Sequence, residues 1–546
     1  QGLSLNSAEP YGFEEVAPGV PADDRIRAVY KKALASAFRG PSDPPPRPFN
    51  RGDPQAFVAW LNTPDPSSRV PLVSRYLSEL YDKRVDLHFA FPGVAGAGAA
   101  GFLEWVVRYG EAEAGIPASL VEPAARAIDD SFAKPAEPSE GGPPLFMELP
   151  DGINIAGYFT AELGVGEMAR LLLLAFQRTP YSFSTYSYRG GFSRRRHPFR
   201  QIGEEFAYNT NLICINADQL GQFVMDTGHR VMQHRYNIGF WWWEVDILPP
   251  GMGRAADLLD EIWVGTEHVA GAVRSVTDKP VYVIPPPMRP ISAQPAEKES
   301  LGLPPGFTFL FTFDFLSVEE RKNPVGVIEA FKIAFPEASD GGPNLVIKSI
   351  NGDRSSLERL KMSAAARPDI KILDGYLPPE RQDALLACCD CYVSLHRSEG
   401  YGIGMAEAMA LGRPIIATGY SGNMAFLNDT NSHLVGYRLV SVPSGSGPYP
   451  EGARWAEPDL KDAARLMRRV WEQPDDAIAL GRQAQSEALT IHTPERTAEH
   501  IVGRMDPIIR RHQRLRHEEE LRRLPPPKAT RISSLRRGLS GFLKGP

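Results

Sequence analysis

Apolar residues follow an alternating strand-and-helix pattern through most of the chain. From Gly152 onward, short continuous apolar runs are separated by stretches with helical spacing. Continuous runs of this length are typical of strands that are buried on both faces of a parallel sheet. The predicted strands are 153–158, 212–215, 237–242, 261–264 and 281–284 in a first series, and 307–313, 344–349, 370–372, 391–395 and 414–418 in a second.

The residues between and after these strands predict helices, among them 167–178, 324–335, 379–388, 403–411, 460–473, 475–487 and 494–523. Strands that alternate with helices form parallel sheets with right-handed crossovers. Two series therefore predict an α/β fold with two Rossmann-like, doubly wound domains, which face each other across a ligand-binding cleft. We expect these domains to span 151–290 and 291–475, and the helices of 476–524 to pack back on the first domain.

The two ends of the chain differ in composition from the rest. Residues 1–150 contain Pro-rich stretches at 43–48 and 134–144 and short amphipathic helices at 57–61, 74–81 and 101–109. This pattern predicts a small, mainly helical module, and nothing in it identifies a protein partner. Residues 525–546 form a basic tail without acidic residues. We favour a disordered tail there; the alternative is a helix that makes a peripheral contact with a membrane surface.

Overall composition narrows the function classes. The formal net charge is −6, which gives no support for bulk nucleic-acid binding. No apolar run reaches the roughly 18 residues that cross a membrane, and no signal sequence opens the chain, so we expect a cytoplasmic protein, peripheral at the inner membrane face if the tail binds there. Cys388, Cys389 and Cys391 do not have zinc-site spacing, and we interpret them as small apolar filler rather than metal ligands.

The run from Ser398 to Ala410 carries the most informative chemistry. Glu399 and Glu407 are separated by eight positions, and glycines stand between them. Glycines let backbone approach a ligand closely, and a helix that begins there directs free N–H groups at an anion. Glu407 would lie one turn inside that helix. A diphosphate at the helix start, with carboxylates placed to accept hydrogen bonds from sugar hydroxyls, indicates a nucleotide-sugar site.

The same run resembles the signature of a known enzyme family. Ser398-Glu399-Gly400-Tyr401-Gly402, followed by Glu407-Ala408-Met409-Ala410-Leu411-Gly412-Arg413-Pro414, resembles the E-x7-E motif of the retaining glycosyltransferases of family 4, which have the GT-B fold. Residues 375–378 and 419–423 resemble the segments before and after that motif. The form of the motif is similar to that of the subgroup found in surface-polysaccharide and O-antigen gene sets.

The resemblance implies roles for individual residues. Glu407 would bind the ribose of the donor, and Glu399 would contact the transferred sugar. The second domain would hold the donor nucleotide sugar and the first domain the acceptor. The residues that would hold sugar and diphosphate are Gly400, Tyr401, Gly402 and Ile403, together with Gly164 and Gly166 in an expected glycine-rich turn after the first strand.

Two positions depart from the family pattern. Lys322 stands at the family's phosphate-binding Lys, whereas Asp314 or Phe315 stands at its Arg, so Arg321 is the expected substitute. Glu244 stands where the family has a His, directly after three tryptophans. Three successive tryptophans cannot all point inward from one strand, and we expect one of them to face the cleft beside Glu244. The alternative is that the tryptophans fill the core and the interface between the domains, with Glu244 in a salt bridge.

The resemblance implies a hexosyltransferase that moves a sugar from a nucleotide diphosphate to a glycan or lipid-linked acceptor with retention. We expect no metal or other cofactor, because no Asp-x-Asp motif follows a strand and cationic side chains with a helix N-terminus can stabilise the leaving group. Other interpretations on this fold are an epimerase or a phosphorylase. From a different class, the departures fit a binding or scaffold protein that has lost catalysis.

Three further signals are discounted. The G-x-G-x-x-G run at 96–101 has no strand before it, and we interpret it as a small-residue loop. The run Arg194-Arg195-Arg196-His197 could hold an acceptor phosphate, but a charged surface loop is the simpler interpretation. His229 and His234 precede the tryptophan strand, and His234 is the one closer to the expected cleft.

Overall fold

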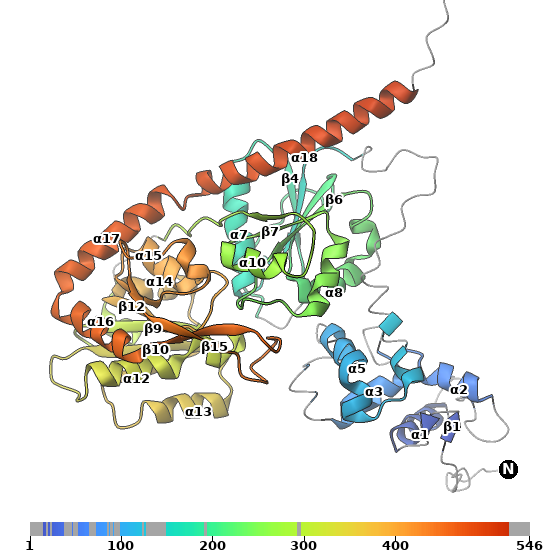
Figure 1. Cartoon of the computed structure of the whole chain (residues 1–546), viewed down its shortest axis with the longest axis horizontal. Coiled ribbons are helices and arrows are strands. Elements are labelled where there is room, and N and C mark those ends of the chain that lie inside the picture. The colour runs from blue at the N-terminus through green and yellow to red at the C-terminus, as the bar shows by residue number, and fades with distance from the viewer. Residues whose placement is uncertain are drawn as a thin grey trace, which may run out of the picture.

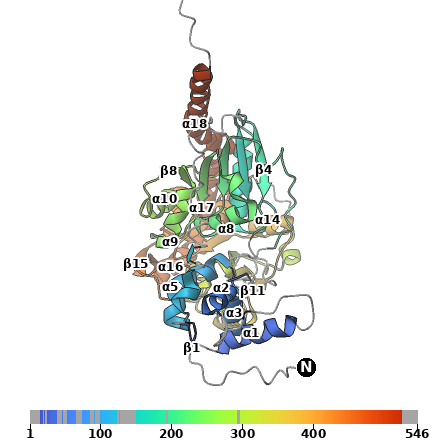
Figure 2. The same ribbon diagram turned by 90° about the vertical axis from the view of Figure 1, so that its right-hand side faces the viewer.

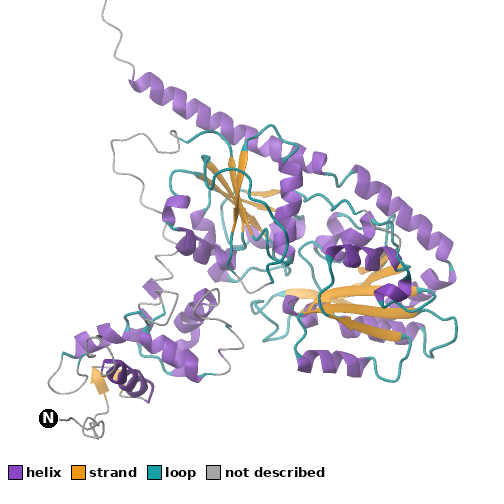
Figure 3. Ribbon diagram, turned by 180° about the vertical axis from the view of Figure 1, so that it is seen from behind, coloured by secondary structure: helices purple, strands orange, loops and turns teal. Residues whose placement is uncertain are grey.

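The computed structural model describes residues 15–17, 20–21, 24–37, 46, 53–64, 73–84, 87, 91, 99–122, 125–126, 149–190, 194–291 and 296–523. Within these ranges the chain forms two six-stranded parallel sheets with helices packed on their faces (Figures 1 and 3). A smaller, mainly helical module precedes them in the chain. The predicted fold class of two Rossmann-like domains after a helical module is therefore confirmed.

The first sheet has the strand order β4-β3-β5-β6-β7-β8, and every neighbouring pair is parallel. Its order reverses between β3 and β5, and ligands of such sheets bind where the order reverses, beyond the carboxyl ends of the strands. The strands are β3 (Ile153–Gly157), β4 (Phe183–Ser187), β5 (Thr210–Cys214), β6 (Tyr236–Trp241), β7 (Glu261–Val264) and β8 (Val281–Val283), and the main helices are α7 (Gly164–Phe176), α8 (Ala217–Thr227) and α10 (Glu267–Arg274).

The second sheet has the order β11-β10-β9-β12-β13-β14 and is also parallel throughout. Here the order reverses between β9 and β12. The strands are β9 (Thr308–Asp314), β10 (Asn344–Ile350), β11 (Ile370–Asp374), β12 (Cys391–Ser394), β13 (Ile415–Thr418) and β14 (His433–Val435), and the helices are α11 (Glu319–Lys322), α12 (Pro324–Ala334), α13 (Arg354–Ser363), α14 (Pro379–Cys388), α15 (Ile403–Ala410), α16 (Leu460–Glu472) and α17 (Pro474–Thr490).

A hairpin and a long terminal helix complete the two-domain body. The hairpin strands β15 (Tyr437–Ser441) and β16 (Arg454–Pro458) are antiparallel. Helix α18 (Pro494–Arg523) leaves the second domain after α17 and packs along α7 of the first (Figure 1). No described helix is long and apolar enough to span a membrane. The tail at 525–546 lies outside the described residues, so both interpretations of it, including the alternative of a membrane contact, stay predictions.

The amino-terminal module has a hydrophobic core of its own, which includes Phe57, Leu77 and Phe102. Its helix α5 packs against α8 of the first sheet domain, on the side shown in Figure 2. Its described elements are β1 (Glu15–Ala17), β2 (Val20–Pro21), α1 (Asp24–Ala37), α2 (Pro54–Leu61), α3 (Arg75–Lys83) and α5 (Ala99–Ala114). Of the discounted glycine run, 96–98 lie outside the described residues and 99–101 begin α5, so the loop interpretation is wrong for its last part.

The glycine-rich turn expected at Gly164 and Gly166 is also wrong, because both residues lie in the first turn of α7. A Cβ at Gly166 would approach the carbonyl oxygens of Tyr158 and Ala161 to 2.7 and 2.9 Å. Glycine therefore lets the start of α7 pack directly on the loop that follows β3. Gly164 and Gly166 therefore lie at the N-terminus of a helix, next to the carboxyl edge of the first sheet.

Candidate functional site

The point where the second sheet reverses its order brings together two loops that are far apart in sequence. Strands β9 and β12 are neighbours. The loop after β9 leads into α11, which carries Arg321 and Lys322, and the loop after β12 carries Glu399. Because parallel strands end at the same edge of a sheet, these side chains meet there. The sequence identified all three residues but not this pairing.

Glu399 is held by a cation on each of its carboxylate oxygens. Lys322 Nζ donates to Oε1 at 2.6 Å, and Arg321 Nη1 lies 3.1 Å from Oε2. The Glu399 side chain is 10% exposed. Burial alone would raise its pKa, but Lys322 and Arg321 outweigh burial and hold the pKa at about 2. Glu399 is therefore ionised throughout the physiological pH range.

The two cations differ in access to ligand. Arg321 is 3% exposed, and its guanidinium also donates to the carbonyls of Ser398 and Ser317 at 2.7 and 2.9 Å. The Lys322 side chain is 19% exposed. Burial, followed by the charge of Arg321, lowers the pKa of Lys322, and Glu399 opposes both. Lys322 is thus the cation of this pair that a bound anion can reach with less rearrangement.

Glu244 joins this cluster from the first domain. Its Oε1 lies 3.9 Å from Arg321 Nη2, and its Oε2 accepts a long hydrogen bond of 3.4 Å from the hydroxyl of Tyr449. Its backbone carbonyl accepts hydrogen bonds from His268 Nε2 at 2.7 Å and from Ser398 Oγ. The four predicted catalytic residues therefore form one charged cluster that spans the two domains. Glu244 therefore lies within salt-bridge distance of Arg321, as the alternative expected, and through that contact it also belongs to the candidate site.

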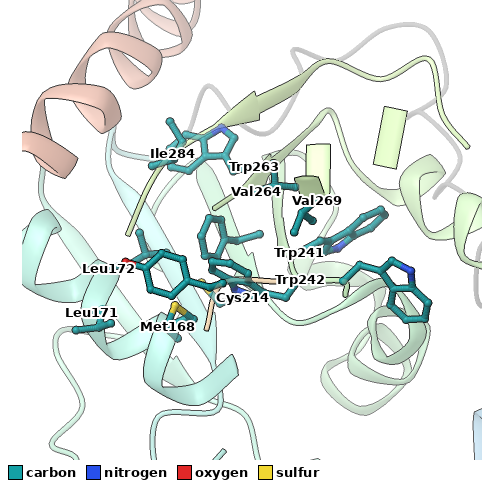
Figure 4. Close-up of a cluster of buried hydrophobic side chains, with 14 of the residues drawn as sticks. Met168, Leu171, Leu172, Cys214, Trp241, Trp242, Trp263, Val264, Val269 and Ile284 are labelled. Carbon is teal, nitrogen blue, oxygen red and sulfur yellow. The ribbon is translucent and has the colours of Figure 1, made fainter. Parts of the chain in front are cut away.

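Two of the three tryptophans face the second domain from the cleft side of the first, but their rings are covered. Trp241, Trp242 and Trp243 are 1%, 7% and 6% exposed. Strand β6 ends at Trp241, so the side chains of Trp242 and Trp243 need not alternate between the two faces of the sheet. Trp242 packs edge-on against Tyr401 and Trp243 against Tyr449, both in the second domain. The apolar cluster around Trp241 and Trp242 appears in Figure 4. All three rings are buried, and none is a free platform for a sugar.

The predicted donor-binding residues line the contact between the domains. Gly402 precedes α15 with a φ of +96°, and Ile403 begins that helix. A Cβ on Gly164, at the start of α7, would lie 3.4 Å from Ile403 Cδ1, so two helix N-termini approach each other here. A Cβ on Gly400 would lie 2.9 Å from the carbonyl oxygen of Trp243, and the Gly400 carbonyl accepts from Thr266 Oγ1 at 3.1 Å.

Glu407 has an arginine partner that sequence reasoning missed. Arg289 Nη2 and Nε donate to Glu407 Oε1 at 2.9 and 3.2 Å. The same guanidinium binds Asp383, through Nη1 at 2.9 Å and through Nη2, and lies 3.9 Å from Glu167. The sequence offers one signal for Arg289, which is a single arginine in a proline-rich run. Its partners lie far away in the sequence, so the run alone does not identify them. Burial raises the pKa of Glu407, and Arg289 opposes that effect.

The cavity beside Glu407 is small. It is lined from the first domain by Glu167 and Met168, from the interdomain segment by Arg289, and from the second by Tyr401 and Glu407. Its volume of about 10 Å³ lies far below the roughly 300–1,000 Å³ of typical ligand pockets. A drug-sized ligand therefore does not fit this cavity in the arrangement of the domains seen here.

The remaining candidates lie outside the charged cluster. Arg194 pairs with Glu162 at 2.6 Å and lies 3.9 Å above the Tyr376 ring, at the rim between the domains. His229 and His234 precede β6, at the amino edge of the sheet and away from the cleft, so the expectation that His234 lies near the cleft is wrong. The four cysteines are free, and no cluster of metal-binding side chains occurs among the described residues.

Comparison with known proteins bears on the second domain. Residues 296–438 match the family model of glycosyl transferases group 1. This segment contains Arg321, Lys322, Glu399 and Glu407, and the match supports a glycosyltransferase domain in this part of the chain. The family match does not extend to the first domain or to Glu244.

No curated protein matches the chain. Among solved structures, it is similar to an S. aureus TarM mutant in complex with fondaparinux, alpha-GlcNAc-glycerol and UDP (13% identity, TM-score 0.40, 54% of each chain), so the match spans about half of that protein. It is also similar to Anabaena HepE with UDP-glucose, with 13% identity and a TM-score of 0.47 over 65% of this chain and 99% of that one. A third similar structure is a Thermosynechococcus elongatus sucrose-phosphate synthase, with 12% identity and a TM-score of 0.48 over 66% of this chain and 99% of that one.

Proposed function

We propose that this protein is a retaining glycosyltransferase of family 4 that moves a sugar from a nucleotide diphosphate to a glycan or lipid-linked acceptor without a metal ion. One observation carries the proposal. Glu399, held by Lys322 and Arg321, lies beside the start of α15, and Glu407 lies one turn further along that helix. This combination supplies cations and a helix N-terminus for a diphosphate, and carboxylates for the hydroxyls of the donor.

The proposed reaction takes place on one face of the transferred sugar. The acceptor hydroxyl oxygen forms a bond to the anomeric carbon while the bond from that carbon to the diphosphate oxygen breaks. The departing phosphate oxygen takes the acceptor proton, so no separate protein base is required. Lys322 stabilises the charge that develops on the diphosphate, aided by the N–H groups at the start of α15. Glu399 then accepts hydrogen bonds from sugar hydroxyls in place of Lys322.

Glu244 is the first-domain residue that we assign to the acceptor side. Its carboxylate is 31% exposed and faces the cluster from the opposite wall of the cleft. A carboxylate accepts a hydrogen bond from a hydroxyl, which orients an acceptor for attack. We place the reaction in surface-polysaccharide synthesis in the cytoplasm, with the basic tail at 525–546 as the candidate membrane contact.

The decisive experiment measures turnover of UDP-, GDP- and dTDP-sugars by the wild type and by Lys322→Ala and Glu407→Ala. We expect Lys322→Ala to lower kcat/KM about 100-fold or more, because it removes a group that stabilises the developing charge. Glu407→Ala should lower kcat/KM about tenfold or more, because it removes a charged hydrogen-bond acceptor for the ribose. Lys361→Ala, an exposed lysine on α13, is the control and should be unchanged. Near-wild-type rates in both site variants would refute the assignment. A wild type that binds none of the donors would favour the scaffold alternative.

A further inference from the structure

The segment that connects the two domains places one arginine at the ribose-binding carboxylate of the proposed donor site. Arg289 directs two N–H groups at the same oxygen of Glu407, Oε1. No described residue donates a hydrogen bond to Oε2, and Glu407 lines the cavity between the domains. Arg289 therefore orients the carboxylate through Oε1, and Oε2 remains available to a ligand.

Arg289 is held firmly in place. It lies in the run Pro285-Pro286-Pro287-Met288-Arg289-Pro290, and prolines restrict both their own backbone and that of the preceding residue. The run is also tied to α18 and to the segment before it, because Thr497 Oγ1 donates to the Pro285 carbonyl at 2.8 Å and Met288 N donates to the His492 carbonyl at 2.9 Å. A rigid segment of this kind fixes an arginine before a ligand arrives.

The charges around Glu407 make this arginine necessary. Asp383 on α14 and Glu167 on α7 are negative neighbours, the Tyr392 hydroxyl on β12 lies nearby, and Arg289 is the cation that faces all three carboxylates. Without Arg289, burial and two like charges would favour protonation of Glu407. A protonated carboxyl is a weaker acceptor for a ribose hydroxyl than a carboxylate.

We propose that Arg289 is a positioning residue that presents Glu407 Oε2, as a carboxylate, to the ribose hydroxyls of the donor. The inference rests on the proposed function and extends it to a residue outside the matched family segment. Arg289 acts through Glu407 and does not itself bind the diphosphate.

The test measures binding of UDP, GDP, dTDP and, separately, inorganic pyrophosphate to the full chain by calorimetry between pH 6 and 8.5. In Arg289→Gln we expect affinity for the nucleoside diphosphate that the wild type binds to fall about tenfold or more at pH 6.5 and to recover as the pH rises, because Glu407 becomes ionised again. Pyrophosphate has no ribose, so its affinity should be unchanged. Arg289→Lys should restore binding in part.

Arg454→Gln is the matched control. Arg454 also joins the two domains, through Asp246 at 3.0 Å, but it lies on the hairpin away from Glu407. It should leave affinity and its pH dependence unchanged. A pyrophosphate affinity that falls as much as that of the nucleotide would mean that Arg289 contacts phosphate, and the inference would be wrong.

The two proposals fail in different ways. A wild type that binds none of the nucleotides refutes the proposed function. A wild type that binds one, with Arg289→Gln binding it equally well or with a loss that does not change with pH, refutes only the role of Arg289. If Arg289→Gln does not fold, Arg289→Lys decides, since wild-type affinity at every pH in that variant overturns the inference.

Discussion

The two glutamates of the motif have opposite electrostatic environments although little of either side chain is exposed. Glu399 faces two cations, and its pKa falls to about 2. Glu407 shares one cation with Asp383 and Glu167, and its pKa is raised, with burial as the largest cause. Spacing in the sequence shows that the two carboxylates belong to one site, but their charge states depend on which side chains surround each of them.

At the scale of single residues, we predict that Glu399→Gln destabilises the folded chain. The substitution leaves Arg321, at 3% exposure, without its closest counter-charge, and loss of one partner of a buried pair costs about 3–5 kcal/mol. Thermal unfolding at pH 7 measures the loss. Glu358→Gln, which removes an exposed partner of Arg354, should change stability by less than about 1 kcal/mol.

The same variant should show a changed dependence on pH. The folded-state pKa of Glu399 lies below the unfolded value, so its stabilising contribution is complete above the unfolded pKa and disappears as pH falls from about 4.5 toward 2. The difference in stability between wild type and Glu399→Gln should therefore shrink below about pH 4.5. A difference that stays constant between pH 7 and 3 would contradict the role of ionised Glu399.

At the scale of elements, helix starts determine the geometry of the site. Helix α7 begins at Gly164 and α15 directly follows Gly402, and a Cβ at either glycine would approach a neighbouring side chain. Gly402 in addition has a φ of +96°, which L side chains rarely adopt. The glycines of the motif are thus required by the fold of the loop as well as by any ligand.

We predict opposite effects for two glycine substitutions. Gly402→Ala places a side chain in left-handed backbone, with its Cβ 2.3 Å from Met405 Cε, and should lower unfolding free energy by about 1–3 kcal/mol. Gly271→Ala, on an exposed position of α10 with no atom within 4 Å of the new Cβ, should raise it by up to about 1 kcal/mol. Denaturant unfolding distinguishes the two, and equal effects would contradict the backbone argument.

At the scale of the molecule, α18 follows α17 of the second domain and packs on α7 of the first. Arg504 on this helix binds Glu261, which is fully buried in β7 and also accepts hydrogen bonds from Tyr236 and Trp263. Arg178 binds Glu495 near the start of the same helix, but both of those side chains are more than half exposed. The first contact anchors the helix, whereas the second adds little.

We predict that Arg504→Met destabilises the first domain and loosens α18. It leaves Glu261 buried without its cation, which costs about 3–5 kcal/mol. Limited proteolysis should then cut α18 earlier than in the wild type, and the Tm should fall. Arg178→Met is the matched control, and its Tm should be nearly unchanged. Equal sensitivity of the two variants to protease would show that Glu261 does not anchor the helix.

Local sequence patterns predicted most of the buried elements. Strand β7 and helix α14 have the predicted bounds, and the other predicted strands of both sheets differ by a few residues at most. Strand β4 was missed because Phe183–Ser187 is polar at most of its positions, and α8 and α10 were missed because glycines interrupt their helical pattern. These elements are stabilised by contacts with neighbouring segments.

The sequence by itself determined the two Rossmann-like series and the residues at the centre of the candidate site, because strand burial, helix period and the glycine-carboxylate motif are local properties. Only the tertiary structure decided that Glu407 pairs with Arg289, 118 residues away, that Trp242 and Trp243 are buried between the domains, and that the cavity beside Glu407 is small. Those outcomes depend on how one domain packs on the other, and pairing across such distances leaves no periodic trace in the chain.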